Sequence, residues 1–263
     1  MSMFTRRRAM LGVGAIVAGT AGWIGLGPRP RNAYYQGPVT DHFDGTSFFN
    51  PGGDTTNSIS ALLRFQLGER FATWPARFPA RLDVPPERVA GRSVRVSYVG
   101  HASFLIQGGG VNLLVDPVWG DRASPVSFAG PKRVNPPGVS FDDLPPIDGV
   151  LITHNHYDHL DVVTVGRIWR RDRPRIVTPL GNDTILRASI DGIEAKGFDW
   201  GETIEVAARS GRGTCRVHLV PTHHWSARGL RDRRHALWAS FVIEIAGVQI
   251  YAIGDTGFGL SLI

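Results

Sequence analysis

The stretch Thr153-His154-Asn155-His156-Tyr157-Asp158-His159-Leu160-Asp161 decides how this chain is interpreted. Directly after an apolar run, it places three histidines and one carboxylate within six positions. Imidazole nitrogens and carboxylate oxygens are ligands that a borderline metal such as zinc accepts. His154 and His156 are two positions apart, so one extended step aims both at the same side, and Asp158 and His159 then turn toward a neighbouring point. The stretch predicts a metal site, and two adjacent metals can grip a phosphoryl or acyl centre and carry the attacking hydroxide.

The elements around this stretch are those of a mixed α/β domain that opens near Arg92. Short alternating or apolar runs bounded by glycine and proline predict strands. The predicted strands cover 94–99, 103–107, 111–116, 148–153, 175–179, 215–221, 238–245 and 248–253. The metal motif follows the fourth strand, and a helix is predicted over 161–171 with Asp161 as its N-terminal carboxylate. The Pro-rich loop 121–146 is long enough to indicate a functional loop.

Further metal ligands have to come from elsewhere in the chain. Thr222-His223-His224-Trp225 and Gly254-Asp255-Thr256-Gly257 each follow a predicted strand. Side chains in loops after strands can converge, because no helix or strand ladder constrains them. His224 and Asp255 are therefore the candidates, and His223 stays an alternative to His224. Asp116, at the end of the third predicted strand, fits a carboxylate that orients a ligand imidazole.

His154-x-His156-x-Asp158-His159 resembles the HxHxDH motif of the metallo-β-lactamase superfamily. Other motifs, over roughly residues 45 to 259, resemble one branch of it, the N-acylphosphatidylethanolamine-hydrolysing phospholipase D-like enzymes. HxHxDH is specific for the superfamily but silent on the substrate, whereas the branch is indicated by the Ala-Gly-Pro-Lys-Arg loop, His-Tyr-Asp-His and His-Trp-Ser. In chain order these motifs are Gly100-His101-Ala102-Ser103, Val115-Asp116-Pro117, Ala129-Gly130-Pro131-Lys132-Arg133, Leu144-Pro145-Pro146-Ile147-Asp148, His224-Trp225-Ser226, Leu237-Trp238 and Gly254-Asp255-Thr256-Gly257.

The resemblance implies a site with two Zn²⁺ ions. One ion would be bound by the first two motif histidines and by His224, the other by the Asp-His pair, and Asp255 would bridge both. The implied metal ligands are His154, His156, Asp158, His159, His224 and Asp255, and Asp158 and Asp255 are also the predicted catalytic carboxylates. Tyr157 is assigned to binding the phosphate or headgroup, although a phenol packed on the loop explains it equally well. His101 fits hydrogen bonding beneath the site as well as it fits catalysis.

The resemblance also implies an αββα sandwich and a zinc-dependent phosphodiesterase. Its substrate would be an N-acylphosphatidylethanolamine-type phospholipid at a membrane surface, cleaved by a hydroxide held on the metals to phosphatidate and an N-acylethanolamine. Nucleic acid is not an expected partner. Two alternatives remain open: the same site acting on a lactone, a cyclic phosphate ester or a nucleic acid, or an inactive remnant that binds lipid without turnover.

Eight residues follow Asp255. The superfamily places another ligand histidine, the last strands and a helix beyond this point, so the second half of the sandwich is expected to be incomplete and the chain truncated. The second metal would then bind more weakly, and an exposed sheet edge would be prone to association.

The hydrolase domain is predicted over residues 91–263. The residues before it divide into two predicted segments. In 1–30, Arg6-Arg7-Arg8 precede the apolar run 9–26, which is typical of an export signal with a twin-arginine-like start or of a membrane anchor. This predicts association with the inner membrane or the periplasm, with the cytoplasmic face as the alternative. Segment 31–90 is an N-terminal extension with an amphipathic helix over 58–71. The apolar face of that helix either packs on the domain or borders a lipid surface.

The composition limits function mainly through charge and cysteine content. The net charge is +6, and only Lys132 and Lys196 are lysines. A basic surface can attract nucleic acid, anionic lipid or a phosphorylated substrate, and the charge does not distinguish among these. An arginine-rich composition with no role in binding explains the net charge equally well. Cys215 is the only cysteine, which excludes an internal disulfide and a thiolate metal cluster.

Overall fold

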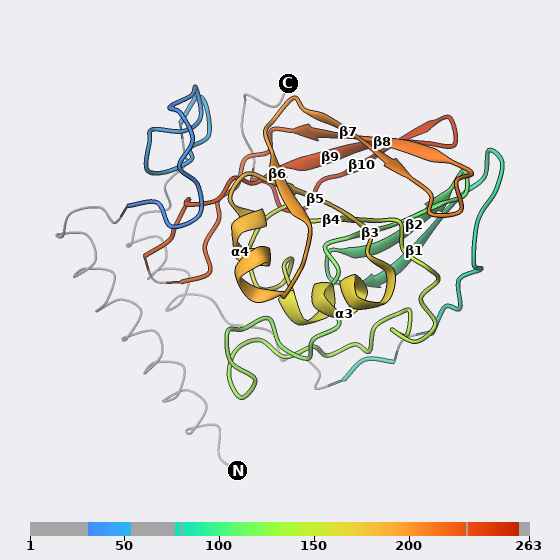
Figure 1. Cartoon of the computed structure of the whole chain (residues 1–263). Helices are drawn as coiled ribbons and strands as arrows, with labels where there is room; N and C mark the ends of the chain where they lie inside the picture. The colour runs from blue at the N-terminus through green and yellow to red at the C-terminus, as the bar shows by residue number, and fades with distance from the viewer. Residues whose placement is uncertain (1–30, 54–76, 80, 230, 258–263) are drawn as a thin grey trace, which may run out of the picture.

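The computed structural model describes residues 31–53, 77–79, 81–229 and 231–257. Two β-sheets lie face to face, and two helices cover the outer side of the larger sheet (Figure 1). The predicted leader 1–30 lies outside the described residues, and so does the predicted helix over 58–71. Within the described part, no helix has the length and apolar character needed to span a membrane.

The larger sheet has six strands in the order β1-β2-β3-β4-β5-β6. Strands β1 to β3 pair antiparallel, whereas β3 to β6 pair parallel. A parallel pair needs a crossover, and α3 (Val162–Asp172) and α4 (Asn182–Ser189) provide those from β4 to β5 and from β5 to β6. The strands are β1 (Val94–Gly100), β2 (Ser103–Gly108), β3 (Val111–Val115), β4 (Gly149–Leu151), β5 (Arg175–Pro179) and β6 (Ala195–Phe198).

The smaller sheet is antiparallel, with the order β10-β9-β8-β7. Its strands are β7 (Thr203–Ala207), β8 (Thr214–Val220), β9 (Ser240–Ile245) and β10 (Val248–Ala252). In β8, Cys215, Val217 and Leu219 are buried, while the intervening side chains are more exposed, as expected for a sheet with one covered face. No described helix covers the outer face of this sheet (Figure 1). The predicted sandwich class is thus confirmed in its two sheets and in the helical layer on the larger sheet.

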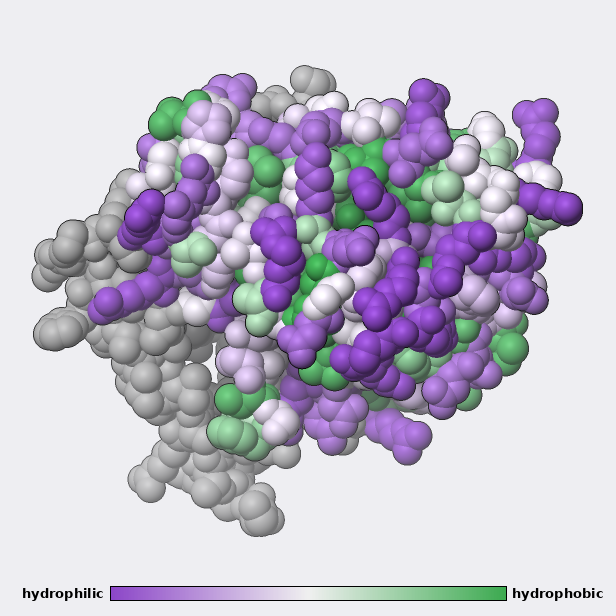
Figure 2. Space-filling model, viewed as in Figure 1, coloured by the Kyte–Doolittle hydropathy of each residue, from purple (hydrophilic) through white to green (hydrophobic). Residues whose placement is uncertain are grey.

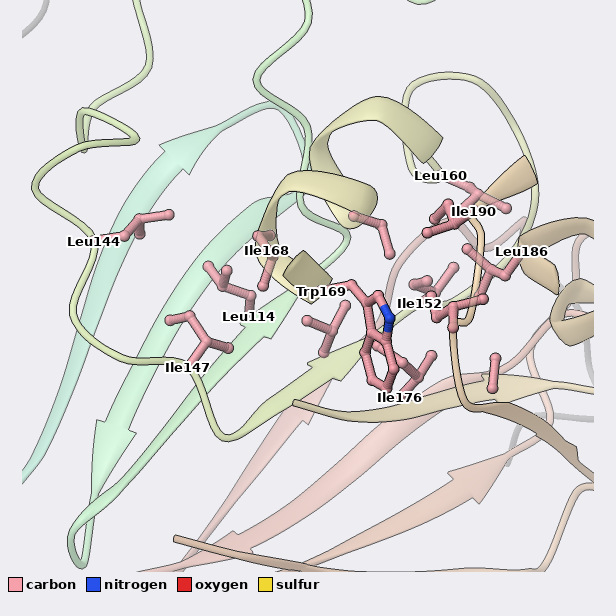
Figure 3. Close-up of a cluster of buried hydrophobic side chains, with 14 of the residues drawn as sticks. Leu114, Leu144, Ile147, Ile152, Leu160, Ile168, Trp169, Ile176, Leu186 and Ile190 are labelled. Carbon is pink, nitrogen blue, oxygen red and sulfur yellow. The ribbon is translucent and has the colours of Figure 1, made fainter. Parts of the chain in front are cut away.

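Two apolar layers hold the elements together. One lies between the sheets and joins, among others, Leu113 and Leu151 to Val217 and Phe241. The other lies between the larger sheet and the helices, where Trp169 and Ile168 of α3 meet Ile176 of the sheet (Figure 3). Helix α3 begins at Val162. Asp161 precedes it, and its side chain accepts from the backbone N–H groups of residues 163 and 164, which confirms its prediction as the N-terminal carboxylate of this helix.

Some predicted boundaries are wrong, and three elements are absent from the sequence prediction. The strand predicted over 148–153 is shorter in the structure, where β4 covers Gly149–Leu151. The Thr153 N–H donates to the Asp116 carboxylate instead of to a strand. Helix α4 has eight residues and no side-chain cap, and β6 and β7 have only four and five residues. Such short elements carry little periodic signal.

The described start of the predicted extension shares a core with the domain. Phe43 and Phe48 are fully buried and cluster with Leu237 and Trp238. The indole N–H of Trp238 donates to the carbonyl of Thr222 at 2.9 Å and lies 3.1 Å from Oδ1 of Asn50. Residues 31–53 therefore brace the loop that carries His224.

Replacing Trp238 with phenylalanine should lower the free energy of unfolding by about 1–3 kcal/mol, because two buried acceptors lose their shared donor. Urea unfolding followed by circular dichroism measures this change. Tyr251→Phe is the control, since Tyr251 is 51% exposed and should change stability by less than about 0.5 kcal/mol. Equal stability of the two variants would contradict the bracing role.

Candidate metal centre

The predicted site residues meet at one edge of the two sheets. His101 follows β1, Asp116 follows β3, and the stretch 153–161 follows β4 in the larger sheet. His224 and Asp255 come from the loops after β8 and β10 in the smaller sheet. Both sheets must therefore face each other before the side chains can converge.

Three imidazole nitrogens form the first group. His154 Nε2 lies 2.9 Å from His156 Nδ1, and His224 Nε2 lies 3.2 Å from each of these atoms. His223 does not belong to this group; its backbone N–H donates to the Thr256 hydroxyl. The structure therefore brings His224, rather than His223, to the two motif histidines.

The second group consists of His101, Asp158 and His159. His101 Nε2 lies 2.9 Å from Asp158 Oδ2, and His159 Nε2 lies 3.9 Å from the same oxygen. His159 is fully buried, whereas the other two side chains are partly exposed at the site. His101 thus stands beside a predicted ligand, and its role, hydrogen bonding beneath the site or catalysis, stays a prediction.

Asp255 lies between the two groups. Its Oδ1 is 3.3 Å from His159 Nε2, and its Oδ2 is 3.7 Å from His224 Nε2. One carboxylate with an oxygen toward each group is the arrangement that a bridging ligand needs. Its coordination of a metal remains a prediction.

Asp116 and Thr153 fix the orientation of two of the imidazoles. Asp116 Oδ2 accepts from His159 Nδ1 at 2.8 Å and from the Thr153 hydroxyl at 2.7 Å. The same hydroxyl lies 3.0 Å from His154 Nδ1, so a proton on that nitrogen can be donated to it. Both Nε2 atoms are then left facing the site, as in metal-bound histidines whose other nitrogen is hydrogen-bonded. The predicted position of Asp116 beside a ligand-type imidazole is observed, whereas Thr153 was not predicted.

The backbone is unusual at two of these residues. His101 has φ 53° and Asp116 has φ 42°, both in the left-handed region that non-glycine residues rarely adopt. Each residue directly follows a strand, so the turn swings its side chain toward the site. Such local conformations gather at functional sites because the surrounding structure holds them.

The electrostatics of the first group favour neutral imidazoles. Burial lowers the pKa of His154 well below its usual value, and the neighbouring histidines lower it further. Burial also lowers the pKa of His156, and burial together with the charge of His156 lowers that of His224 to about 4. These side chains are therefore unprotonated at neutral pH and offer lone pairs to a cation.

The second group favours the charged forms of its side chains in the metal-free protein. Burial lowers the pKa of His159, but the Asp116 and Asp255 carboxylates outweigh burial and raise this pKa to about 10. Burial raises the pKa of Asp158, but the hydrogen bond from His101 and the charge of His159 outweigh it and lower this pKa to about 2. A cation at His159 Nε2 would replace a proton there.

The arrangement of donors fits a metal ion. Tetrahedral zinc with bonds of 2.0–2.1 Å needs ligand nitrogens about 3.3 Å apart, and the three nitrogens of the first group are 2.9–3.2 Å apart. In the second group, buried His159 Nε2 has no hydrogen-bond partner in the described structure although it faces two carboxylates. Three imidazole nitrogens at this spacing can all direct lone pairs at one cation.

Arg228 holds the metal-motif loop in place, and no motif predicted it. Its Nη1 donates to the carbonyls of Asn155 and Leu160 at 2.9 and 2.8 Å. Its guanidinium lies 4.0 Å from the ring centre of Tyr157, whose hydroxyl donates to the Arg228 carbonyl at 3.1 Å. The phenol thus packs on the loop, and its predicted contact with a headgroup would require this hydrogen bond to break.

Replacing Arg228 with alanine should weaken metal binding by about 10- to 100-fold, the range found when partners behind metal ligands are removed. The reason is that the carbonyls of Asn155 and Leu160 lose the donor that fixes the loop. Competition of the purified variant against a zinc-binding dye measures the effect. The control is Arg231→Ala, which removes an exposed cation from the loop between β8 and β9 that also carries Arg228. It should leave the metal affinity unchanged. Equal losses of affinity in both variants would show that net charge, and not the two hydrogen bonds, is responsible.

An apolar cavity of about 490 Å³ opens beside the second group. It lies between the larger sheet and β10, with Phe104, Ile106 and Ile250 among its lining residues. His101 and Asp255 also line it. The metal-type groups are therefore accessible from a cavity whose walls suit an apolar ligand.

Comparison with known proteins extends these observations. The N-acyl-phosphatidylethanolamine-hydrolyzing phospholipase D 1 of Caenorhabditis elegans is 39% identical over 170 residues, which cover 62% of this chain and 46% of that protein. The mitochondrial N-acyl-phosphatidylethanolamine-hydrolyzing phospholipase D of Saccharomyces cerevisiae is 30% identical over 151 residues, which cover 57% of this chain and 31% of that protein. The chain spans less than half the length of these curated relatives. Among solved structures, Igni18, a metallo hydrolase from Ignicoccus hospitalis, matches with a TM-score of 0.44 and 22% identity over 64% of each chain.

A family match covers the sheets and loops that carry the site. The family described as Beta-lactamase superfamily domain matches residues 111–260, which are more than half of the chain. This range begins at β3 and includes the stretch 153–161, His224 and Asp255. The chain therefore belongs to the β-lactamase superfamily.

Proposed function

We propose that this chain hydrolyses the phosphodiester bond of N-acylphosphatidylethanolamine-type phospholipids, as a phospholipase D. One observation carries the proposal: Asp255 lies between two groups of metal-type donors and also lines an apolar cavity. A phosphodiester at the mouth of that cavity would face both groups while an attached acyl chain lay against Phe104 and Ile250. The names of the nematode and yeast relatives support the same substrate class.

The proposed cofactor is a pair of zinc ions. His154, His156 and His224 would hold one ion, Asp158 and His159 would hold the other, and Asp255 would contact both. When bound, the ions would supply Lewis acidity for a phosphoryl oxygen and ease deprotonation of water. Zinc suits this mixture of imidazole and carboxylate, and iron accepts the same donors, so the metal must be measured directly.

The protein's own contribution is orientation and charge. Asp116 keeps a proton on His159 Nδ1, which leaves Nε2 facing the site. Thr153 does the same for His154. In-line attack on phosphorus gives phosphatidate and an N-acylethanolamine, and the departing alkoxide needs a proton. His101, half-exposed at the cavity and bonded to Asp158, is placed on the side from which substrate would approach.

The proposal is tested by comparing substrates on one preparation of the zinc-loaded full chain. N-Acylphosphatidylethanolamine in mixed micelles, a long-chain lactone, a cyclic nucleotide and a DNA oligonucleotide are assayed side by side, with mass spectrometry of the products. The expected result is equal release of phosphatidate and N-acylethanolamine, which a chelator stops and added zinc restores. Turnover of the lactone or a nucleotide alone would refute the assignment, as would turnover that survives complete metal removal.

A further inference from the structure

The loop 121–133, between β3 and β4, exposes apolar side chains at its tip. Phe128 is 82% exposed, the largest value among the large apolar side chains of the described residues, and Val126 is 37% exposed. A single exposed apolar residue is ordinary on a protein surface. An exposed phenylalanine at the tip of a loop that hydrogen bonds hold at its base is better suited to contact a partner.

The loop is fixed at its base rather than free. The Arg133 N–H donates to the Asp121 carbonyl at 2.8 Å, and Arg122 Nη1 donates to the Gly130 carbonyl at 2.6 Å. These bonds close a narrow hairpin around residues 124–129. The tip is therefore presented outward at little further cost in conformational entropy when it is bound.

Basic residues stand at the base of the loop, below the apolar tip. The loop contains Arg122, Lys132 and Arg133 against a single carboxylate, Asp121. Lys132 is exposed and pairs with Arg122 across the base of the hairpin, whereas the Arg133 guanidinium turns inward to the carbonyls of Gly120 and Val118. An apolar tip with basic neighbours is the combination that enters the interface of a bilayer containing anionic lipid.

The loop is also joined to the rim of the metal centre. The Gly120 N–H donates to Asp161 Oδ2 at 3.0 Å, and Asp161 is the last residue of the metal-motif stretch. Next to the base of the loop, the Phe78 N–H donates to the Val134 carbonyl, and the Phe78 side chain is 46% exposed. Figure 2 shows a small hydrophobic patch at the lower edge of the molecule, where a loop projects from the fold in Figure 1.

We propose that loop 121–133 is an interfacial anchor that inserts Phe128 and Val126 into a phospholipid surface containing anionic lipid, while Arg122 and Lys132 face the headgroups. Insertion would keep the rim of the metal centre at the lipid surface. The purpose of the anchor rests on the proposed function, but the insertion itself is a binding event that needs no turnover.

Site-specific labelling of the full chain tests the proposal. Phe128→Cys is labelled with an environment-sensitive fluorophore on a maleimide. Cys215 does not compete, because it is buried and burial raises the pKa of its thiol to about 12. Vesicles of phosphatidylcholine with phosphatidylglycerol should shift the emission at 128 to shorter wavelength, and lipids with a nitroxide on the acyl chain should quench it.

The matched control is Val39→Cys with the same label. Val39 is 69% exposed and belongs to the segment 31–53, drawn in blue far from the loop in Figure 1. Its emission should not shift, even when another part of the chain brings the protein to the vesicle. A label at 128 that stays in water on vesicle-bound protein would overturn the proposal, and so would a lack of vesicle binding. Equal insertion into pure phosphatidylcholine would overturn the role of the cations.

A second variant separates this inference from the proposed function. Phe128→Ser should fold normally, since the side chain is exposed, and should lose about tenfold or more in hydrolysis of vesicle substrate. Its hydrolysis of a short-chain, monomeric phosphodiester should equal that of the unchanged chain. Equal losses on both substrates would contradict an interfacial role. Absence of all phosphodiester hydrolysis would refute the proposed function and leave the labelling result intact.

Discussion

Replacing His154 with alanine is expected to abolish metal binding at the first group together with phosphodiester hydrolysis. His154 supplies one of the three converging nitrogens, and its Nε2 lies within 3.2 Å of both others. Only two of the three imidazoles would be left beside the Asp255 carboxylate, and losing one nitrogen of the set should weaken the binding of a cation strongly. A fall in turnover of roughly 10³-fold or more is expected, since the polarising charge at the phosphoryl group would be lost. Elemental analysis of the purified variant and product release measure both effects.

His223→Ala is the matched control, because His223 neighbours His224 in the chain but lies outside the cluster. It should retain metal and turnover. Retained turnover in metal-free His154→Ala protein would refute the mechanism, and equal loss in the His223 variant would show that the wrong histidine has been assigned to the group. The His154 side chain is buried, with 1% exposure of the residue, so circular dichroism should establish that the variant has folded.

The predictable part of the site is the part that is local in sequence. Six consecutive positions contain His154, His156, Asp158 and His159. The chemistry of these side chains alone indicates a metal site. The choice of Asp255 needed the resemblance, because its approach depends on two sheets packing face to face. The structure places the Asp255 carboxylate 3.3 Å from His159 Nε2. The spacing of residues along the sequence does not predict this distance.

The supporting residues could not have been found from motifs. Thr153 acts through one hydroxyl shared between Asp116 and His154, and threonine at the end of a strand is too common to mark a site. Arg228 was one of many arginines, and its two backbone acceptors belong to a loop about 70 positions earlier. Hydrogen bonds to backbone carbonyls leave no trace in the identity of the acceptor residue.

Replacing Asp116 with alanine is expected to be the most destabilising single change at the site. Asp116 and His159 are both fully buried, and Asp116 also accepts from the Thr153 N–H and hydroxyl. Removing one partner of a buried ion pair costs about 3–5 kcal/mol, because the other charge is left without compensation. Urea unfolding of the metal-free protein at pH 6 measures the loss. Asp148→Asn is the comparison at another fully buried carboxylate, one that lies outside the metal centre.

The cost of losing Asp116 should depend on pH in a defined direction. The pKa of His159 is raised from 6.5 to about 10 in the folded, metal-free chain, because carboxylates outweigh burial. A raised folded pKa contributes stability that is complete below the unfolded pKa and is lost as pH rises through the folded one. The difference in unfolding free energy between the unchanged chain and the Asp116→Ala variant should therefore be largest below pH 6.5 and shrink progressively toward pH 10. A difference that grows with pH would show that His159 is neutral in the folded protein and that Asp116 holds it by an uncharged hydrogen bond alone.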